Sequence, residues 1–227
     1  METLSPYFPR NLTCPLCGKT FQSLKTRSKF VGVLRFETDF QPIYSNPEVN
    51  PLLYNIAVCT HCGYSFSDDF SPYFPPGTKQ VLLDKVANHW VPQDLGGMRT
   101  ISEGIKAYKL AAYCGGLKQE KHVTMAGIYL RTAWLFRGTN QGQENRFMKL
   151  AANEYERSYM ADDFKGTKMS EIRIYYMIAD LSKRTGDLSK AAQYYSRVIE
   201  RQRKTDEAGI IELAKEGWAS VRELKTV

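Results

Sequence analysis

The chain has 227 residues, of which 43% are hydrophobic and 24% charged. This balance is typical of a soluble globular protein and excludes a wholly disordered or fibrous chain. The formal net charge of +7 favours acidic partners only weakly, and the length allows one large domain or two of ordinary size.

The N-terminal stretch, Met1 to Arg10, has an acid before its only basic residue and two prolines where a signal peptide would have an apolar run. No apolar run in the chain approaches the roughly 18 to 20 residues that cross a bilayer. We therefore expect a cytoplasmic protein without a membrane partner.

Four of the five cysteines form two pairs with identical spacing, Cys14-Pro15-Leu16-Cys17-Gly18 and Cys59-Thr60-His61-Cys62-Gly63. Two intervening residues let both thiolates of a pair face one ion, and the following glycine permits a tight turn. A reducing cytosol favours metal binding over disulfides. The spacing predicts one structural zinc per chain held by Cys14, Cys17, Cys59 and Cys62, with iron as the alternative metal.

Other interpretations of these cysteines are less favoured. A thioredoxin-like redox pair would begin a helix, whereas strand-like residues follow both pairs. A catalytic zinc would need one thiolate to leave a position for water. His61 could replace a sulfur, but the adjacent Cys62 completes the repeated spacing, so we expect His61 to be an exposed loop residue. The lone Cys114 is expected to be a buried apolar residue.

The residues between the two pairs are rich in β-branched and aromatic types, notably Phe30 to Phe36 and Leu52 to Val58. Prolines interrupt the segment, so we expect two or three short strands joining two metal-binding turns. Residues 1–76 are predicted to form a zinc-ribbon-like domain, because the metal would stabilise a core too small to fold alone.

Within this predicted domain, the segment from Arg10 to Phe36 has six basic residues and no acidic residue. Phe21, Phe30 and Phe36 alternate with them, and phosphate contacts with base stacking are typical of nucleic-acid binding. This predicts a possible nucleic-acid surface, although the aromatic rings could equally belong to the core. Its candidate residues are Lys19, Lys25, Arg27, Lys29 and Arg35.

Helical periodicity begins after Pro75-Pro76-Gly77, where proline becomes rare. Residues 77–227 are therefore predicted to form a helical domain, and the fold class is α+β, mainly α. Apolar residues lie on two faces of the segment Ser170 to Thr185, which predicts an inner helix. The expected helices are Lys79–Trp90, Ser102–Cys114, Lys121–Arg137, Gln143–Met160, Ser170–Thr185, Leu188–Arg203 and Asp206–Leu224.

An internal repeat appears at a shift of 40 residues, which aligns Ala151-Ala152 and Tyr155 with Ala191-Ala192 and Tyr195. The later unit, with Gly186-Asp187 at its turn, has the pattern of a tetratricopeptide-like helical hairpin. Such arrays bind peptides in extended grooves.

The two cysteine pairs, their spacing and the helical tail together resemble an uncharacterised bacterial family, the domain of unknown function numbered 2225. The resemblance covers nearly the whole chain. It supports the architecture and implies no activity.

The sequence contains no recognisable catalytic set. His89 and His122 have no acid–base partner in their motifs, and the adjacent acids of Asp68-Asp69 and Asp162-Asp163 point apart on a strand or helix. No phosphate-binding loop or nucleophile motif is present. We therefore predict a non-enzymatic zinc-containing scaffold whose helical tail recognises a protein or peptide, with nucleic-acid binding as the alternative.

Overall fold

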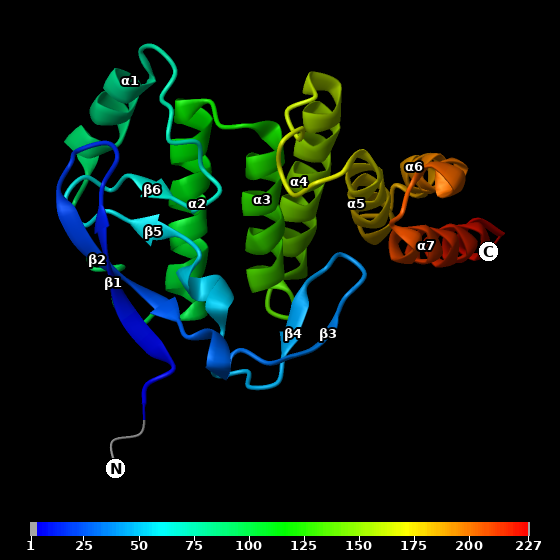
Figure 1. Cartoon of the computed structure of the whole chain (residues 1–227), viewed down its shortest axis with the longest axis horizontal. Helices are drawn as coiled ribbons and strands as arrows, with labels where there is room; N and C mark the ends of the chain where they lie inside the picture. Colours follow the sequence, from blue (N-terminus) through cyan, green and yellow to red (C-terminus); the bar gives the residue numbers. More distant parts are fainter. Residues whose placement is uncertain (1–3, 227) are drawn as a thin grey trace. The chain divides into compact units, whose positions relative to one another are not determined.

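The computed structural model describes residues 4–226 and has an α+β fold that is mainly helical (Figure 1). The chain forms two compact units. Unit 1 contains the chain up to Phe36 together with Pro42–Glu120. Unit 2 contains Glu37–Gln41 and the chain from Lys121 onward. A short piece of the β-rich region thus belongs to the helical unit.

The strands of unit 1 pair antiparallel as three separate hairpins rather than as one sheet. Strand β1 pairs with β2 through a register that ends at Thr13 and Thr20, and β5 pairs with β6 through Val58 and Ser65. Both hairpins therefore end at a cysteine turn. The strands are β1 (Tyr7–Thr13), β2 (Thr20–Thr26), β3 (Val33–Phe36), β4 (Pro42–Tyr44), β5 (Ala57–Val58) and β6 (Ser65–Phe66).

The prediction of a strand over Leu52 to Val58 is wrong for the first half of that segment. Residues Pro51–Tyr54 form a short 3-10 helix, and β5 begins only at Ala57. Pro51 has a fixed φ suited to the first helical position, and the Asn50 side chain accepts a hydrogen bond from the Leu52 amide at 3.0 Å. A local cap and proline therefore override the β-rich composition.

Two helices belong to unit 1, α1 (Thr78–Lys85) and α2 (Ile101–Lys118). The sequence assigned both to the helical domain that begins at residue 77, whereas the compact units divide at Lys121. The physical reason is a shared core: Leu82 of α1, its C-terminal cap Val86 and Cys114 of α2 lie in one buried cluster with Cys14, Cys59 and Cys62. Burying these faces requires the cysteine-bearing lobe.

Arg99 also connects the start of α2 to the β-rich part of unit 1. Its buried guanidinium donates to the carbonyls of Leu53 and Ile56, both at 2.8 Å. Helix α2 continues through Gly115-Gly116, beyond the predicted end at Cys114, to Lys118, and Gln119 caps it in the left-handed conformation. In this last helical turn the buried Lys118 pairs with Glu120.

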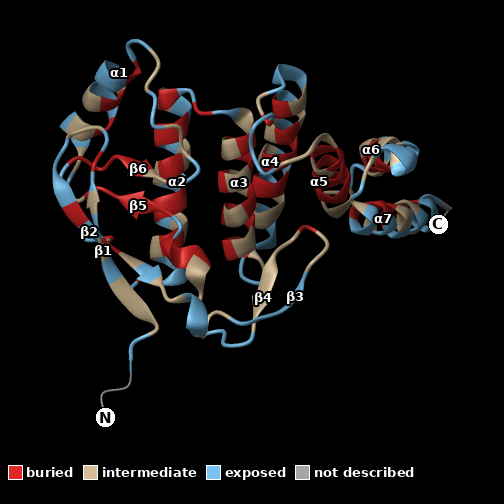
Figure 2. Cartoon of the chain, in the orientation of Figure 1, coloured by how far each residue is buried: buried red, intermediate tan, exposed pale blue. Residues whose placement is uncertain are grey.

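Unit 2 consists of five helices in which each packs on the next along the chain. The burial-coloured view shows α5 as almost wholly buried (Figure 2), and every α5 residue from Ile174 to Ser182 is buried. This confirms the predicted inner helix. The helices are α3 (His122–Phe136), α4 (Gln141–Ala161), α5 (Glu171–Arg184), α6 (Leu188–Glu200) and α7 (Ala208–Thr226).

Two pairs of residues in the predicted repeat are buried in both α4 and α6. Ala151 and Ala191 are fully buried, as are Tyr155 and Tyr195 at 5% and 0% exposure. Gly217 of α7 lies directly against Tyr195, because an added Cβ would stand 2.3 Å from the tyrosine ring. The absence of a side chain at Gly217 therefore lets Tyr195 fill the space between α6 and α7.

Within residues 4–226, no helix combines the length and the apolar character that crossing a membrane requires.

Candidate metal centre

Both cysteine turns have the same backbone geometry. The amide of the first cysteine donates to the carbonyl five residues later, at 2.9 Å for Cys14 and 3.0 Å for Cys59. The glycine after the second cysteine donates back to the first cysteine, at 2.9 Å for Gly18 and 2.8 Å for Gly63. Their φ angles of +73° and +72° lie in the left-handed region, where a side chain would be strained. The repeated Cys-x-x-Cys-Gly sequence thus produces two equivalent turns.

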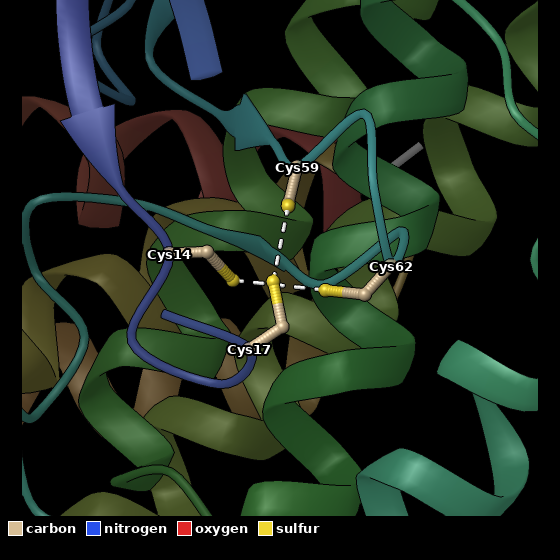
Figure 3. A group of neighbouring side chains, drawn as sticks. All are labelled: Cys14, Cys17, Cys59 and Cys62. Carbon is tan, nitrogen blue, oxygen red and sulfur yellow. Dashed lines mark hydrogen bonds between the residues drawn. The ribbon is translucent and has the colours of Figure 1, made fainter. Parts of the chain in front are cut away.

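The four paired cysteines, which we call the cysteine cluster, point their sulfurs toward one another (Figure 3). The Sγ atoms of Cys14 and Cys62 are 3.6 Å apart, those of Cys17 and Cys59 are 3.8 Å apart, and all four lie within 4.8 Å. A tetrahedron with zinc–sulfur bonds of about 2.3 Å has edges of about 3.8 Å. None of the four cysteines forms a disulfide. The cluster therefore has both the free thiols and the sulfur spacing that a four-thiolate metal site requires.

The thiols of the cluster compete for negative charge. Hydrogen bonding with Cys59 raises the pKa of Cys14 to about 12. Hydrogen bonds with Cys14 and Cys62 lower the pKa of Cys59 to about 2, while hydrogen bonds with Cys14 and Cys59 raise the pKa of Cys62. One thiolate therefore forms at the expense of the others. A metal ion would remove this conflict because its charge stabilises all four thiolates, and the residues present could hold such an ion.

His61 lies between the cysteines of the second pair but turns away from the cluster. Its side chain is exposed, and its Nε2 atom lies 3.0 Å from the Thr20 carbonyl. Among the described residues, the group that could hold a metal ion consists of the four cysteines and does not contain His61. The histidine thus connects the second turn to β2.

Packing holds the second turn in place. Trp90 donates from Nε1 to the carbonyl of Thr60 at 2.9 Å. A Cβ added to Gly63 would stand 2.3 Å from the indole ring, so only glycine fits beneath it. Trp90 follows a 3-10 helix just after α1, which explains why α1 belongs to the unit that contains the cysteine cluster.

Cys114 is fully buried in the core around the cluster. Its sulfur accepts a hydrogen bond from the Ser65 amide at 3.4 Å, and burial raises the pKa of its thiol to about 11. A protonated, enclosed thiol is a poor nucleophile. These contacts fit the predicted role as a buried apolar residue.

The five candidate nucleic-acid residues lie on several elements of unit 1. Lys19 is in the first cysteine turn, Lys25 is on β2 and Arg35 is on β3, and all three are exposed. Lys29 is exposed on a short 3-10 helix, whereas Arg27 is half-buried with its guanidinium 4.8 Å from the centre of the Phe8 ring.

The aromatic residues of that predicted surface differ in burial. Phe21 is only 6% exposed and belongs to the core around the cluster, so it is unavailable for base stacking. Phe36 is 61% exposed, and Phe30 is half-buried. The interpretation of these rings as core residues is therefore correct for Phe21 alone.

Unit 2 contains a buried acidic residue that no sequence motif indicates. The segment Glu37–Gln41, which we call the docked segment, lies between β3 and β4 and belongs to unit 2. Its Asp39 is fully buried and accepts hydrogen bonds from Trp134 at 2.9 Å and from Arg137 at 2.6 Å, with Arg184 3.8 Å away. Burial alone would raise the pKa of Asp39, but the Arg137 hydrogen bond and the two arginine charges lower it.

The neighbours of Asp39 extend this contact. The Thr38 carbonyl accepts a hydrogen bond from Tyr176 at 2.8 Å, and the Thr38 hydroxyl donates to Asp180 at 3.0 Å. Phe40 has a φ of +64°, unusual for a bulky residue, and its ring centre lies 5.5 Å from that of Tyr176. No local motif marks these residues, because their partners are more than ninety positions away along the chain.

His122 and Asp163, for which the sequence found no partners, lie together at the start of α3. Asp163 accepts hydrogen bonds from the His122 amide and from the Ser158 hydroxyl, both at 2.5 Å. The His122 ring contacts Glu154 at 2.6 Å. The acid therefore caps α3, and the histidine connects α3 to α4.

Of the three comparisons with known proteins, the comparison with protein families finds a match. No curated protein and no solved structure matches it. The family described as "Uncharacterized protein conserved in bacteria (DUF2225)" matches residues 7–221, which is nearly the whole chain. The protein therefore belongs to this bacterial family.

Proposed function

We propose that the protein is a non-enzymatic binding protein with one structural zinc ion in unit 1 and a peptide-recognising surface in unit 2. Four thiolates at tetrahedral spacing support zinc, with iron as the metal that the same geometry would also suit. Four protein ligands complete the coordination sphere, so this ion would have no position left for a substrate. A reduced four-cysteine site fits a cytoplasmic location.

The docked segment is the observation that carries the binding function. Unit 2 holds five residues of non-helical chain by burying an acid between arginines, accepting backbone contacts and packing an aromatic ring. These are the interactions by which a protein surface recognises an extended peptide. Helices α5 and α6 contact each other and are joined at Gly186-Asp187, which supports the proposal of a tetratricopeptide-like hairpin. A partner peptide would use this type of surface.

The test compares peptide and nucleic-acid binding by the full-length protein. A random peptide library is panned on the immobilised protein, and binding of labelled single-stranded DNA is measured by fluorescence anisotropy at physiological salt. We expect enriched peptides whose affinity is unchanged when Lys25, Arg27 and Lys29 are all replaced by Glu. A matched control replaces Lys165, Lys168 and Lys204, three exposed lysines of unit 2, by Glu.

Nucleic-acid binding is the outcome that would overturn this assignment. DNA affinity with a log–log salt slope of roughly −3 to −4, lost in the unit 1 triple variant and kept in the control, would identify the basic residues as the functional surface. A library that yields no binding peptide would equally contradict the proposal.

A further inference from the structure

The two cysteine turns share a backbone geometry but have different surroundings. A Cβ added to Gly18 in the first turn would meet no heavy atom within 4 Å beyond its chain neighbours, whereas a Cβ added to Gly63 in the second turn would stand 2.3 Å from the Trp90 ring. Gly18 is exposed and Gly63 is buried. The same residue in the same conformation is therefore open to solvent in one turn and covered in the other.

Several contacts hold the second turn in place. Trp90 donates to the carbonyl of Thr60 at 2.9 Å, and the Ser65 hydroxyl donates to the carbonyl of Gly63, also at 2.9 Å. Tyr64, which follows the turn, is only 1% exposed and belongs to the core around the cysteine cluster. The second turn can therefore keep its conformation without help from a metal ion.

The first turn has fewer contacts of this kind. Within the part of the chain that the structure describes, no hydrogen bond joins Leu16, Gly18 or Lys19 to residues outside the turn. Leu16 is half-buried against the core around the cluster, and the hairpin of β1 and β2 carries the turn at its end. The conformation of the first turn thus depends more strongly on the bonds that its own sulfurs form.

Cys17 is the most accessible member of the cysteine cluster. The other three cysteines are at most 5% exposed, whereas Cys17 is half-buried. It also belongs to the less firmly held turn. A small molecule can therefore reach the Cys17 sulfur from solvent without disturbing the core that encloses Cys59 and Cys62.

We propose that Cys17 is the ligand through which the site exchanges its metal ion, and that a small thiol is the exchange partner. The incoming thiolate forms a bond to the metal as the bond from the metal to the Cys17 sulfur breaks. Cys17 leaves as a thiolate, so the total charge is unchanged, while Cys59 and Cys62 keep the ion. A thiol suits an all-sulfur site because it replaces one soft ligand by another. This inference rests on the metal ion of the proposed function.

Site-resolved alkylation identifies the exchanging ligand. The zinc-loaded full-length protein is treated with a limiting amount of N-ethylmaleimide, and the modified cysteines are located by fragmentation mass spectrometry. We expect Cys17 to be modified about tenfold faster than Cys59 and Cys62, because its sulfur is both accessible and easily detached.

Trp90→Phe tests whether the contacts of the second turn cause this order. The variant keeps an aromatic ring over Gly63 but removes the hydrogen bond to Thr60. Alkylation of Cys59 and Cys62 should become about three- to tenfold faster, the effect of one lost hydrogen bond, while the rate at Cys17 should not change. Trp218→Phe, in unit 2, is the matched control and should react as wild type.

Zinc transfer tests the exchange partner. Transfer from the full-length protein to a chromogenic chelator is followed at increasing concentrations of glutathione, and we expect the rate to rise with the thiol concentration. Leu16→Ala removes packing from the first turn and should raise the thiol-dependent rate about three- to tenfold. Leu34→Ala, at an exposed leucine of unit 1, is the matched control and should transfer zinc at the wild-type rate.

Equal alkylation of the two cysteine pairs, or faster alkylation of the second pair, would overturn the assignment of Cys17. A transfer rate that does not depend on glutathione, or a wild-type rate in Leu16→Ala, would overturn the exchange through the first turn. In each of these cases a protein that still contains one zinc per chain would leave the proposed metal site intact. Purified protein without any metal would instead reject that site, and this inference with it.

Discussion

Units 1 and 2 reach a folded core by different routes. In unit 1, four cysteines from two distant hairpin turns meet at one point, and the strands around them are short. In unit 2, five helices pack in succession, and α5 is buried nearly all around. Stability in the first unit should therefore depend on a few specific ligands, and stability in the second should be distributed over many contacts.

The docked segment crosses this division. It lies in the sequence between Cys17 and Cys59, yet its contacts belong to unit 2. A metal ion that joins the two cysteine turns would restrict the chain on both sides of the segment. The chain therefore passes between the two units on both sides of the docked segment as well as at Lys121.

Loss of the metal is expected to have the largest effect. Elemental analysis of freshly purified protein should find one zinc per chain. Cys17→Ser should lose the zinc, because this variant has only three of the four sulfur ligands. Structural zinc sites contribute on the order of 10 kcal/mol to folding. Cys114→Ala should retain the full metal content. Less than about half an equivalent of zinc plus iron, or unchanged metal in Cys17→Ser, would contradict the site.

The extent of unfolding after chelation tests where the units divide. Hydrogen exchange read by mass spectrometry should show loss of protection in unit 1, including α2, because its core is shared with the cysteine turns. Helices α5 and α6 should remain protected. If α2 stays protected while residues up to 76 exchange freely, the boundary lies near residue 77 as the sequence suggests.

Removing the buried acid of unit 2 should have the next largest effect. Asp39→Asn removes the fully buried charge that contacts both Arg137 and Arg184, which then keep only Glu144 and Asp180 respectively, and we expect a loss of about 2 to 4 kcal/mol in the free energy of unfolding. Urea titration followed by circular dichroism measures it. Asp206→Asn, at an exposed position of unit 2, should change stability by less than about 0.5 kcal/mol. Equal stability of the two variants would show that the Asp39 contacts are dispensable.

The smallest expected effect is the pH dependence of the stability difference between wild type and Asp39→Asn. The folded-state pKa of Asp39 is lowered, so its contribution is fully present above the unfolded value of about 3.9 and is lost as the pH falls through the folded value. The stability gap between wild type and Asp39→Asn should therefore be constant from pH 5 to 7 and narrow below about pH 4. A gap that widens on acidification would refute the assigned charge.

The elements that local patterns specify were predicted well. The repeated Cys-x-x-Cys-Gly turns predicted the four-cysteine cluster, which could hold a metal ion, because two intervening residues and a glycine restrict the backbone to one geometry. The inner helix α5 was recognisable because its apolar residues cover two faces. The strand predicted over Leu52 to Val58 was partly wrong, since Pro51 and the Asn50 cap favour a 3-10 turn there.

The sequence by itself determined the four-cysteine cluster, the seven helices and the mainly α fold class, because spacing and periodicity act over a few residues. Only the tertiary structure decided that α1 and α2 belong with the cysteine turns, since that depends on which apolar faces share a core. It alone revealed Asp39 between two arginines and Trp90 against the second cysteine turn. Such groupings join residues far apart in the chain, and no local pattern encodes the burial that gives them their chemistry.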